Sequence, residues 1–144
     1  MQLTGHVQSG EGNAAYWLAK DADAYRLWTG VDIVPGSLNV LLSTKFDWAA
    51  AEIAPYLRVF SLVPFGGNRD ILLVPCEIST DRHASPVPAF AWATTIAAAA
   101  PAPDYHVLEL IAPLNLRQTL TLPDQTSVTI SIPMPWPIDQ QPEH

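Results

Sequence analysis

The chain has 144 residues, a formal net charge of −7, and 49% hydrophobic against 15% charged residues, which predicts one compact domain and excludes disorder over most of it. Its seven Lys and Arg residues are too few for the clustered cations that bind a nucleic-acid backbone, so we expect no nucleic-acid partner. The sequence contains neither an apolar run long enough to span a bilayer nor the pattern of a signal peptide, so we expect a cytoplasmic protein with no membrane partner.

Fourteen prolines spread along the chain predict short strands joined by turns, because proline rarely sits inside a regular element. Apolar, β-branched and alternating segments predict eight strands, at Leu3–Val7, Tyr16–Leu18, Leu38–Leu42, Leu57–Val63, Ile71–Ile78, Ala89–Thr94, Val107–Ile111 and Ser127–Ile132. Helical patterns are fewer than strand patterns, and they predict two short helices, at Asp21–Trp28 and Trp48–Ala54. Thr44 or Asp47 would cap the second helix. We therefore expect a mainly β barrel over residues 1–133 and a Pro-rich tail over residues 134–144, with a polar, extended end at Gln140–His144.

A glycine-containing loop, Ser9-Gly10-Glu11-Gly12-Asn13, follows the first expected strand. Glycine lets a ligand approach the backbone closely, as in loops that hold phosphate groups. An ordinary β-turn uses the same residue types, so the loop alone does not indicate a ligand. Trp17, shortly after this loop, is either a core residue or one side of a site for a planar ligand.

A second unusual segment is Pro35-Gly36-Ser37-Leu38-Asn39-Val40. In a strand, Ser37 and Asn39 share one face while Leu38 and Val40 lie on the other. A hydroxyl and an amide oxygen on one face are suitable partial ligands for Mg²⁺ that is held mostly by phosphates and water. The same pattern also fits the polar outer face of an edge strand.

Glu109 stands in the middle of the apolar strand Val107–Ile111. A carboxylate there either faces solvent or accepts hydrogen bonds from a ligand or a neighbour, because burying it alone is costly. Shortly after it, Arg117 could contact a phosphate group, or pair with Glu109 or Asp124.

In their order along the chain, these segments resemble the CTP-dependent riboflavin kinases best known from archaea. The family pattern reads approximately SGxGEG, then PGTLNV, then IEIIAPxxLRexLxL. This chain has SGEGN, PGSLNV and LELIAPLNLRQTLTL at the corresponding places. The resemblance extends from about Leu3 to Ile132, and the second and third motifs are its specific parts.

The resemblance implies a six-stranded Greek-key barrel of the cradle-loop type with one or two short helices. It also implies transfer of the γ-phosphoryl group of CTP to the 5′-hydroxyl of riboflavin, which gives FMN and CDP with Mg²⁺ as the cofactor. By the family's pattern, Ser37 and Asn39 would hold the metal and Glu109 would contact the flavin. The nucleotide would be bound by two segments, Gly10, Glu11, Gly12 and Asn13 in the first, and Leu114, Asn115, Leu116 and Arg117 in the second.

The chain departs from the family pattern at several positions. Ala14 and Ala15 follow the loop where the family has a glycine and a cation, and the family's threonine before the glutamate strand falls within Ala100–Pro103, which has no hydroxyl. These differences, with Pro101 among them, support an alternative function: a flavin- or nucleotide-binding barrel that has lost phosphoryl transfer.

Overall fold

The computed structural model describes residues 1–10, 13–83, 85–96 and 104–137. The strands in chain order are β1 (Gln2–Gln8), β2 (Leu38–Asp47), β3 (Arg58–Ser61), β4 (Arg69–Ser79), β5 (Val87–Ile96), β6 (Asp104–Ile111) and β7 (Ser127–Ser131). The helices are α1 (Asn13–Lys20), α2 (Ala22–Thr29), a 3₁₀ turn η1 (Val63–Phe65) and α3 (Leu116–Leu120). The expected end of the tail, Gln140–His144, lies outside the described residues.

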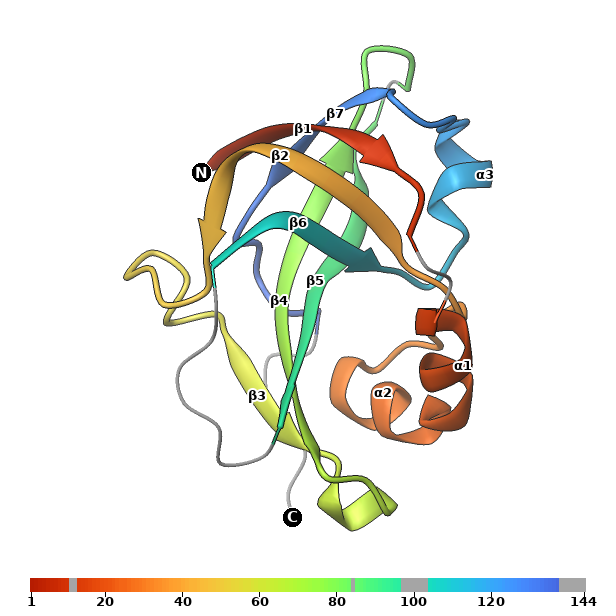
Figure 1. Cartoon of the computed structure of the whole chain (residues 1–144), viewed down its shortest axis with the longest axis vertical. Coiled ribbons are helices and arrows are strands. Elements are labelled where there is room, and N and C mark those ends of the chain that lie inside the picture. Colours follow the sequence, from red (N-terminus) through yellow and green to blue (C-terminus); the bar gives the residue numbers. More distant parts are fainter. Residues whose placement is uncertain (11–12, 84, 97–103, 138–144) are drawn as a thin grey trace.

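Six of these strands close into an antiparallel barrel, in the order β4-β5-β6-β2-β1-β7 with a β4–β7 pairing that completes the circle (Figure 1). β3 is an additional strand that pairs with β4 outside the closed circle. The expectation of a mainly β, six-stranded barrel is therefore confirmed; the described residues form three short α-helices and a 3₁₀ turn, where one or two short helices were expected. Closure leaves no unpaired edge among the six barrel strands, which removes the usual site of unwanted strand pairing.

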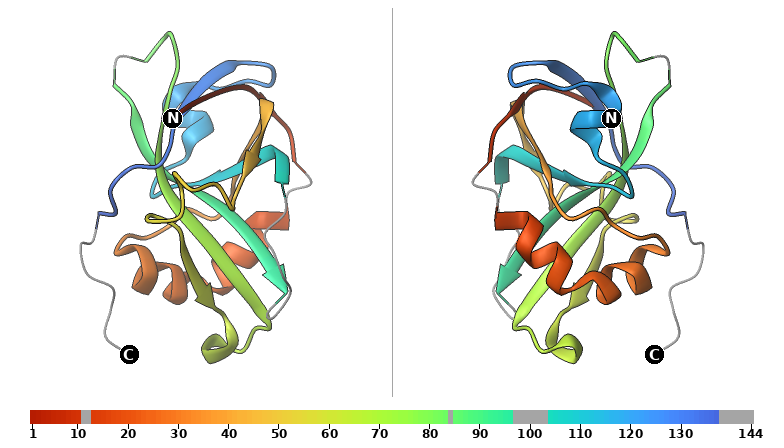
Figure 2. Two further views of the ribbon diagram at one scale, coloured as in Figure 1. Left: turned by 90° about the vertical axis from the view of Figure 1, so that its left-hand side faces the viewer. Right: turned by 90° about the vertical axis from the view of Figure 1, so that its right-hand side faces the viewer.

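Among the residues that the structure describes, two separate hydrophobic clusters stabilise the fold. The first fills the barrel interior with the inward-facing residues of the strands, for example Val40, Val74, Ala91 and Leu108. The second lies on the outer face of β4, β5 and β6, where their alternate residues pack against α1 and α2. Figure 2 shows these two helices on the outside of the barrel. The barrel thus has a covered outer face as well as a filled interior.

The helical hairpin α1–α2 differs in part from the sequence prediction. A helix at Asp21–Trp28 is confirmed by α2, which ends at Gly30 with φ 78°, a left-handed conformation that glycine adopts without strain. The strand expected at Tyr16–Leu18 is wrong, because these residues belong to α1. Alanine and leucine are good helix formers, and the helix buries Leu18 in the outer cluster while Trp17 remains half-exposed.

The helix expected at Trp48–Ala54 is also wrong. This segment is a series of turns, in which the Asp47 carboxylate accepts a hydrogen bond from the Ala49 backbone N–H at 2.8 Å. Trp48 and Ile53 reach the barrel interior from these turns, so packing at the barrel end determines the conformation. Conversely, the short helix α3 was not expected; Asn115 caps it by accepting from the Gln118 N–H at 3.0 Å.

After β7 the chain runs along the outside of β4. The Met134 N–H donates to the Pro75 carbonyl at 2.8 Å, and the Trp136 indole N–H donates to the Tyr56 carbonyl at 2.6 Å. The Arg58 guanidinium lies 4.1 Å from the centre of the Trp136 ring. Residues up to Trp136 are thereby packed against the barrel.

Candidate functional site

The candidate site is built on a row of side chains that crosses four strands. Backbone register pairs Trp92 of β5 with Glu109 of β6, Glu109 with Asn39 of β2, and Asn39 with Gln8 of β1. Paired residues of adjacent strands point to the same face of a sheet, and here that face is outside the barrel. The neighbours of Asn39 and Glu109 along each strand fill the interior instead, as the alternation around Leu38 and Val40 predicted.

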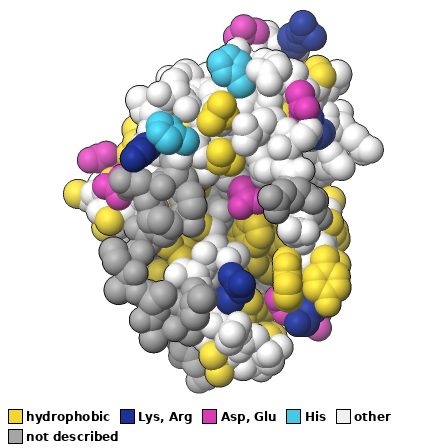
Figure 3. Space-filling model, viewed as in Figure 1, with side chains coloured by type: hydrophobic (Ala, Val, Ile, Leu, Met, Phe, Trp, Pro, Cys, Tyr) yellow, Lys and Arg dark blue, Asp and Glu magenta, His cyan; other side chains and the backbone are white. Residues whose placement is uncertain are grey.

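A cavity of about 750 Å³ lies between this row and the helical hairpin. Figure 3 shows this face of the molecule hollowed, with hydrophobic side chains inside the hollow and an acidic side chain at its edge. The volume is in the range of cavities that bind cofactors and drug-sized ligands. One end of the cavity is formed by small and polar residues, and the other by aromatic residues.

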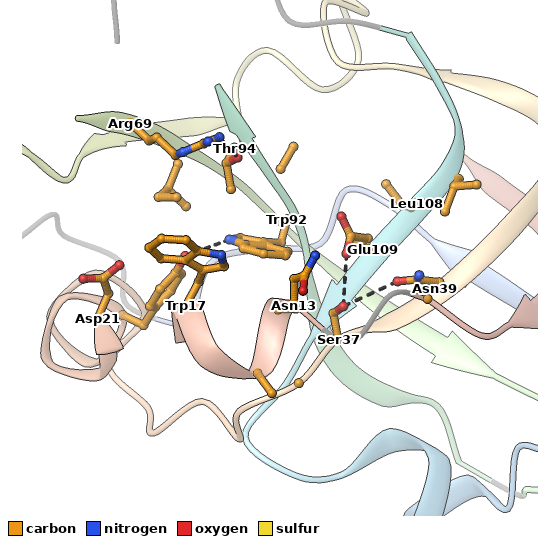
Figure 4. A pocket seen from close by; sticks show the side chains of 18 of the residues that line it. Asn13, Trp17, Asp21, Ser37, Asn39, Arg69, Trp92, Thr94, Leu108 and Glu109 are labelled. Carbon is orange, nitrogen blue, oxygen red and sulfur yellow. Dashed lines mark hydrogen bonds between the residues drawn. The ribbon is translucent and has the colours of Figure 1, made fainter. Parts of the chain in front are cut away.

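Three oxygen atoms meet at the polar end. The Ser37 hydroxyl lies 3.1 Å from Glu109 Oε1 and 3.4 Å from Asn39 Oδ1. Dashed lines mark both hydrogen bonds in Figure 4. One hydroxyl proton cannot satisfy both acceptors, so the cluster has more acceptors than donors. Burial raises the pKa of the Glu109 carboxyl, and the Ser37 hydrogen bond partly offsets that rise. The sequence left open whether Glu109 faces solvent or accepts hydrogen bonds. Its side chain is half-buried and accepts a hydrogen bond from its neighbour Ser37.

The glycine loop approaches this cluster closely. A Cβ atom added to Gly10 would lie 2.1 Å from Asn39 Nδ2, so only glycine fits beside the amide in its present position. Gly10 and Asn13 both line the cavity, whereas Glu11 and Gly12 lie outside the described residues. Before Ser37, Gly36 has φ 133°, a conformation that favours glycine and turns the chain into β2.

The segment Leu114–Arg117 lies next to the same end of the cavity. Together with Gly36 and Ser37 it lines a smaller hollow of about 100 Å³. Within this segment the Leu116 side chain is buried and the Asn115 side chain caps α3. Arg117 is the residue of this segment that lines both the small hollow and the large cavity.

Within the described part of the chain, Arg117 donates three hydrogen bonds to protein acceptors. They go to the carbonyls of Leu122 (2.8 Å) and Gln8 (3.2 Å) and to Asp124 Oδ1 (2.8 Å). The Asp124 carboxyl also accepts from Ser9 at 2.6 Å, and the hydrogen bonds from Ser9 and Arg117 lower its pKa. Of the two carboxylates named above as possible partners, Glu109 and Asp124, Arg117 bonds to Asp124. The pair connects the glycine loop to the turn before β7.

Aromatic side chains form the other end of the cavity, and most of them were not expected there. Trp92 of β5 and Tyr25 of α2 line it with Trp17 of α1. The Trp92 indole N–H donates to the Tyr25 hydroxyl at 2.8 Å. A sequence signal for Trp92 exists: Phe90 and Trp92 alternate with alanines at 89, 91 and 93, which is the pattern of a strand with small residues inside and large ones outside.

The polar end of the cavity has oxygen ligands suited to the Mg²⁺ that the resemblance implies. Within the described part of the chain, no group of three His, Cys, Asp or Glu side chains forms a metal site. The Ser37, Asn39 and Glu109 oxygens form an acceptor-rich cluster of the type that Mg²⁺ prefers, with ligand positions left for phosphate groups and water. The residues present therefore fit a metal that reaches the site with a nucleotide.

No protein-family model and no curated protein matches this chain in sequence. Among the described residues, no helix is long and apolar enough to cross a membrane. The geometry of the cavity and the order of the motifs are therefore the observations that bear on function.

Proposed function

We propose that this protein phosphorylates riboflavin to FMN with CTP as the phosphoryl donor. The observation that carries the proposal is the convergence of separate motifs on one cavity. Gly10 and Asn13, Ser37 and Asn39, Glu109, and Arg117 come from four segments of the chain, and all of them line the same hollow.

The two ends of the cavity suit the two parts of such a reaction. The small hollow along Leu114–Arg117 would offer backbone groups to a pyrimidine base, and the phosphate groups would lie in the cavity where Gly10 and Asn39 both line it. The aromatic end beyond Glu109 is suited to the flat, largely apolar flavin ring. In this arrangement the ribityl chain would run past Glu109, and its terminal hydroxyl would reach the phosphates.

The reaction forms a bond between the 5′-oxygen of riboflavin and the γ-phosphorus of CTP, breaks the bond to the β–γ bridging oxygen, and releases CDP and a proton. Phosphoryl transfer depends mainly on positioning and on neutralising charge, so it does not require a strong base. Mg²⁺, when bound, would neutralise charge on the transferred group. Ser37 and Asn39 would hold the metal, and Glu109 would orient the acceptor by accepting a hydrogen bond from the ribityl chain.

A flavin- or nucleotide-binding barrel without catalysis is the second candidate. The three hydrogen bonds from Arg117 to protein acceptors favour this candidate. An arginine that is already bonded to the protein neutralises less of the negative charge that develops on a phosphoryl group. Ala14 and Ala15 in place of a glycine and a cation point the same way. In this case ligands would stabilise the protein without being converted.

A turnover assay separates these functions. Purified protein is incubated with riboflavin, Mg²⁺ and one of CTP, ATP, GTP or UTP, and FMN is resolved by chromatography. FMN formed with CTP, and reduced at least tenfold in Ser37→Ala, is the expected result. Ser43→Ala is the matched control, because this exposed hydroxyl lies within β2, the strand that Ser37 precedes, and pairs with Thr4 away from the cavity.

Two other outcomes would change the conclusion. If no nucleotide gives FMN but riboflavin or CTP raises the melting temperature, the binding barrel is the correct function, since a ligand that binds only the folded state stabilises it. If neither ligand binds to a protein with a cooperative melting transition, both candidates are wrong.

A further inference from the structure

At the aromatic end of the cavity, the described residues leave the large side chain of Trp17 about half-exposed. Trp17 is 47% exposed, although it lines the cavity and its neighbour Leu18 is buried in the outer cluster. An indole left half in water forgoes a large favourable burial term. A flat partner placed against the ring would remove it from water.

The Trp17 ring is held in place by its own helix. The Tyr16 ring meets it edge-on, with centres 5.0 Å apart and planes at 84°, and the Lys20 ammonium lies 5.1 Å from its centre. Figure 4 shows the indole extending from α1 toward the strand that carries Trp92. A ring already held in one orientation loses little freedom on binding a ligand, and this favours affinity.

The opposite wall of the cavity is fixed more firmly. Trp92 is almost fully buried, and its indole N–H is bonded to the Tyr25 hydroxyl. Burial raises the pKa of this hydroxyl well above its ordinary value, so it stays protonated at neutral pH. Tyr25 also packs edge-on against Trp28 of α2. The Trp92 wall is therefore tied to the helical hairpin that carries Trp17.

Polar groups around these rings indicate what the edge of a ligand must offer. Arg69 and Thr94 line the same cavity and are joined by a hydrogen bond of 3.3 Å from Arg69 Nη1 to the Thr94 hydroxyl. The Asp21 carboxylate lines it as well. A guanidinium donates and a carboxylate accepts, so a ring that carries both carbonyl oxygens and an N–H on its edge matches this lining.

We propose that Trp17 and Trp92 form a binding site for a planar heteroaromatic ring with an imide-like edge, and that Trp17 supplies much of the affinity for such rings. This inference deepens the proposed function, and it rests on that function for its first probe, riboflavin. Trp17 provides the face on which the ring stacks, and Trp92 provides the fixed wall.

The test titrates riboflavin into wild type, Trp17→Ala and Trp17→Phe, and follows quenching of flavin fluorescence. The ring stacks on this side chain, so Trp17→Ala is expected to weaken riboflavin binding by about tenfold or more. Trp17→Phe keeps a ring and should stay within about threefold of wild type. The control is Leu27→Ala on α2, which removes a side chain of similar exposure, 51%, that does not line the cavity. Melting temperatures show that each variant is folded.

The outcomes distinguish this inference from the proposed function. If wild type binds riboflavin and folded Trp17→Ala binds it equally well, the ring site is wrong and the proposed function stands. If wild type does not bind riboflavin, cytidine, adenosine and lumazine (a planar bicyclic imide) are titrated by calorimetry. If lumazine binds and Trp17→Ala weakens its binding, the ring site is supported and riboflavin is not the substrate. If none of these rings binds, both the ring site and riboflavin as its ligand are refuted.

Discussion

Replacing Gly10 by alanine tests how the glycine loop and the oxygen cluster are connected. The added Cβ would lie 2.1 Å from Asn39 Nδ2, and ordinary contact begins at 3.4 Å, so the Asn39 amide must move by about 1 Å or more. The atom in the way is the end of a side chain at the edge of a cavity, so the backbone can remain in place. We therefore expect a large effect on the site and a small one on stability.

The expected loss follows from this displacement. Moving a positioning group by about 1 Å can lower a rate by about 100-fold, so we expect kcat/KM for CTP-dependent FMN formation to fall about 10- to 100-fold in Gly10→Ala. Calorimetric titration of CTP with Mg²⁺ gives a second measurement that does not require turnover. The melting temperature should stay within about 2 °C of wild type, because no buried contact is lost.

Gly66→Ala is a control with the opposite profile. Gly66 lies in the turn between η1 and β4 with φ 88° and has no atom within 4 Å of an added Cβ. Alanine there is strained but collides with nothing, so it should cost about 1 kcal/mol of stability and about 3 °C in melting temperature. The site lies elsewhere, so activity should be unchanged.

A double-mutant cycle shows whether the Gly10 effect passes through Asn39. If it does, Gly10→Ala adds nothing once Asn39 is already alanine. Independent, additive losses would refute the reasoning. Normal activity in the Gly10→Ala single variant, together with reduced activity in the Asn39→Ala single variant, would also refute it.

Three further predictions concern the frame around the site. Hydrogen bonds from Ser9 and Arg117 lower the pKa of the Asp124 carboxyl in the folded state, so this group stabilises the fold above pH 3.8 and its contribution is lost as the pH falls through the lowered pKa. Asp124→Asn should therefore lower the melting temperature at pH 7, and the difference from wild type should shrink below pH 3.8; an equal difference at both pH values would contradict this. Trp136→Ala should lower the free energy of unfolding by about 3 kcal/mol in urea titrations, because the buried indole packs against other rings and bonds to a backbone carbonyl; a change below about 1 kcal/mol would show that this segment contributes little. Burial raises the pKa of the Cys76 thiol to about 12, so iodoacetamide at pH 8 should label the unfolded protein in guanidinium chloride but not the folded protein. Mass spectrometry measures the labelling.

Most of the barrel could be predicted from the sequence because strands leave a local pattern. Seven of the eight expected strands overlap observed ones, and the alternation around Leu38 and Val40 gave the correct inward face. The errors occur where local preference and tertiary packing compete. Trp48 starts a segment that looks helical by its alanines, yet the barrel interior takes up Trp48 and Ile53 from a set of turns.

The site could be predicted in its polar half and not in its aromatic half. Ser37, Asn39 and Glu109 belong to sequence motifs that indicate chemistry, and the structure brings their oxygens together. Trp92 and Arg69 belong to no motif, and they reach the cavity through the register of β4 and β5. Strand register depends on contacts between distant segments, so a single sequence does not reveal which outward-facing residues become neighbours.

The division into two hydrophobic clusters affects how readily this protein can acquire a new ligand. The residues that fill the barrel interior and those that face the helical hairpin are largely different sets, carried on alternate positions of the same strands. Substitutions on the outer positions and on α1 can therefore reshape the cavity while the interior that closes the barrel stays intact. Evolution, or a designer, could exchange the ligand of this barrel by altering one helix and one row of side chains.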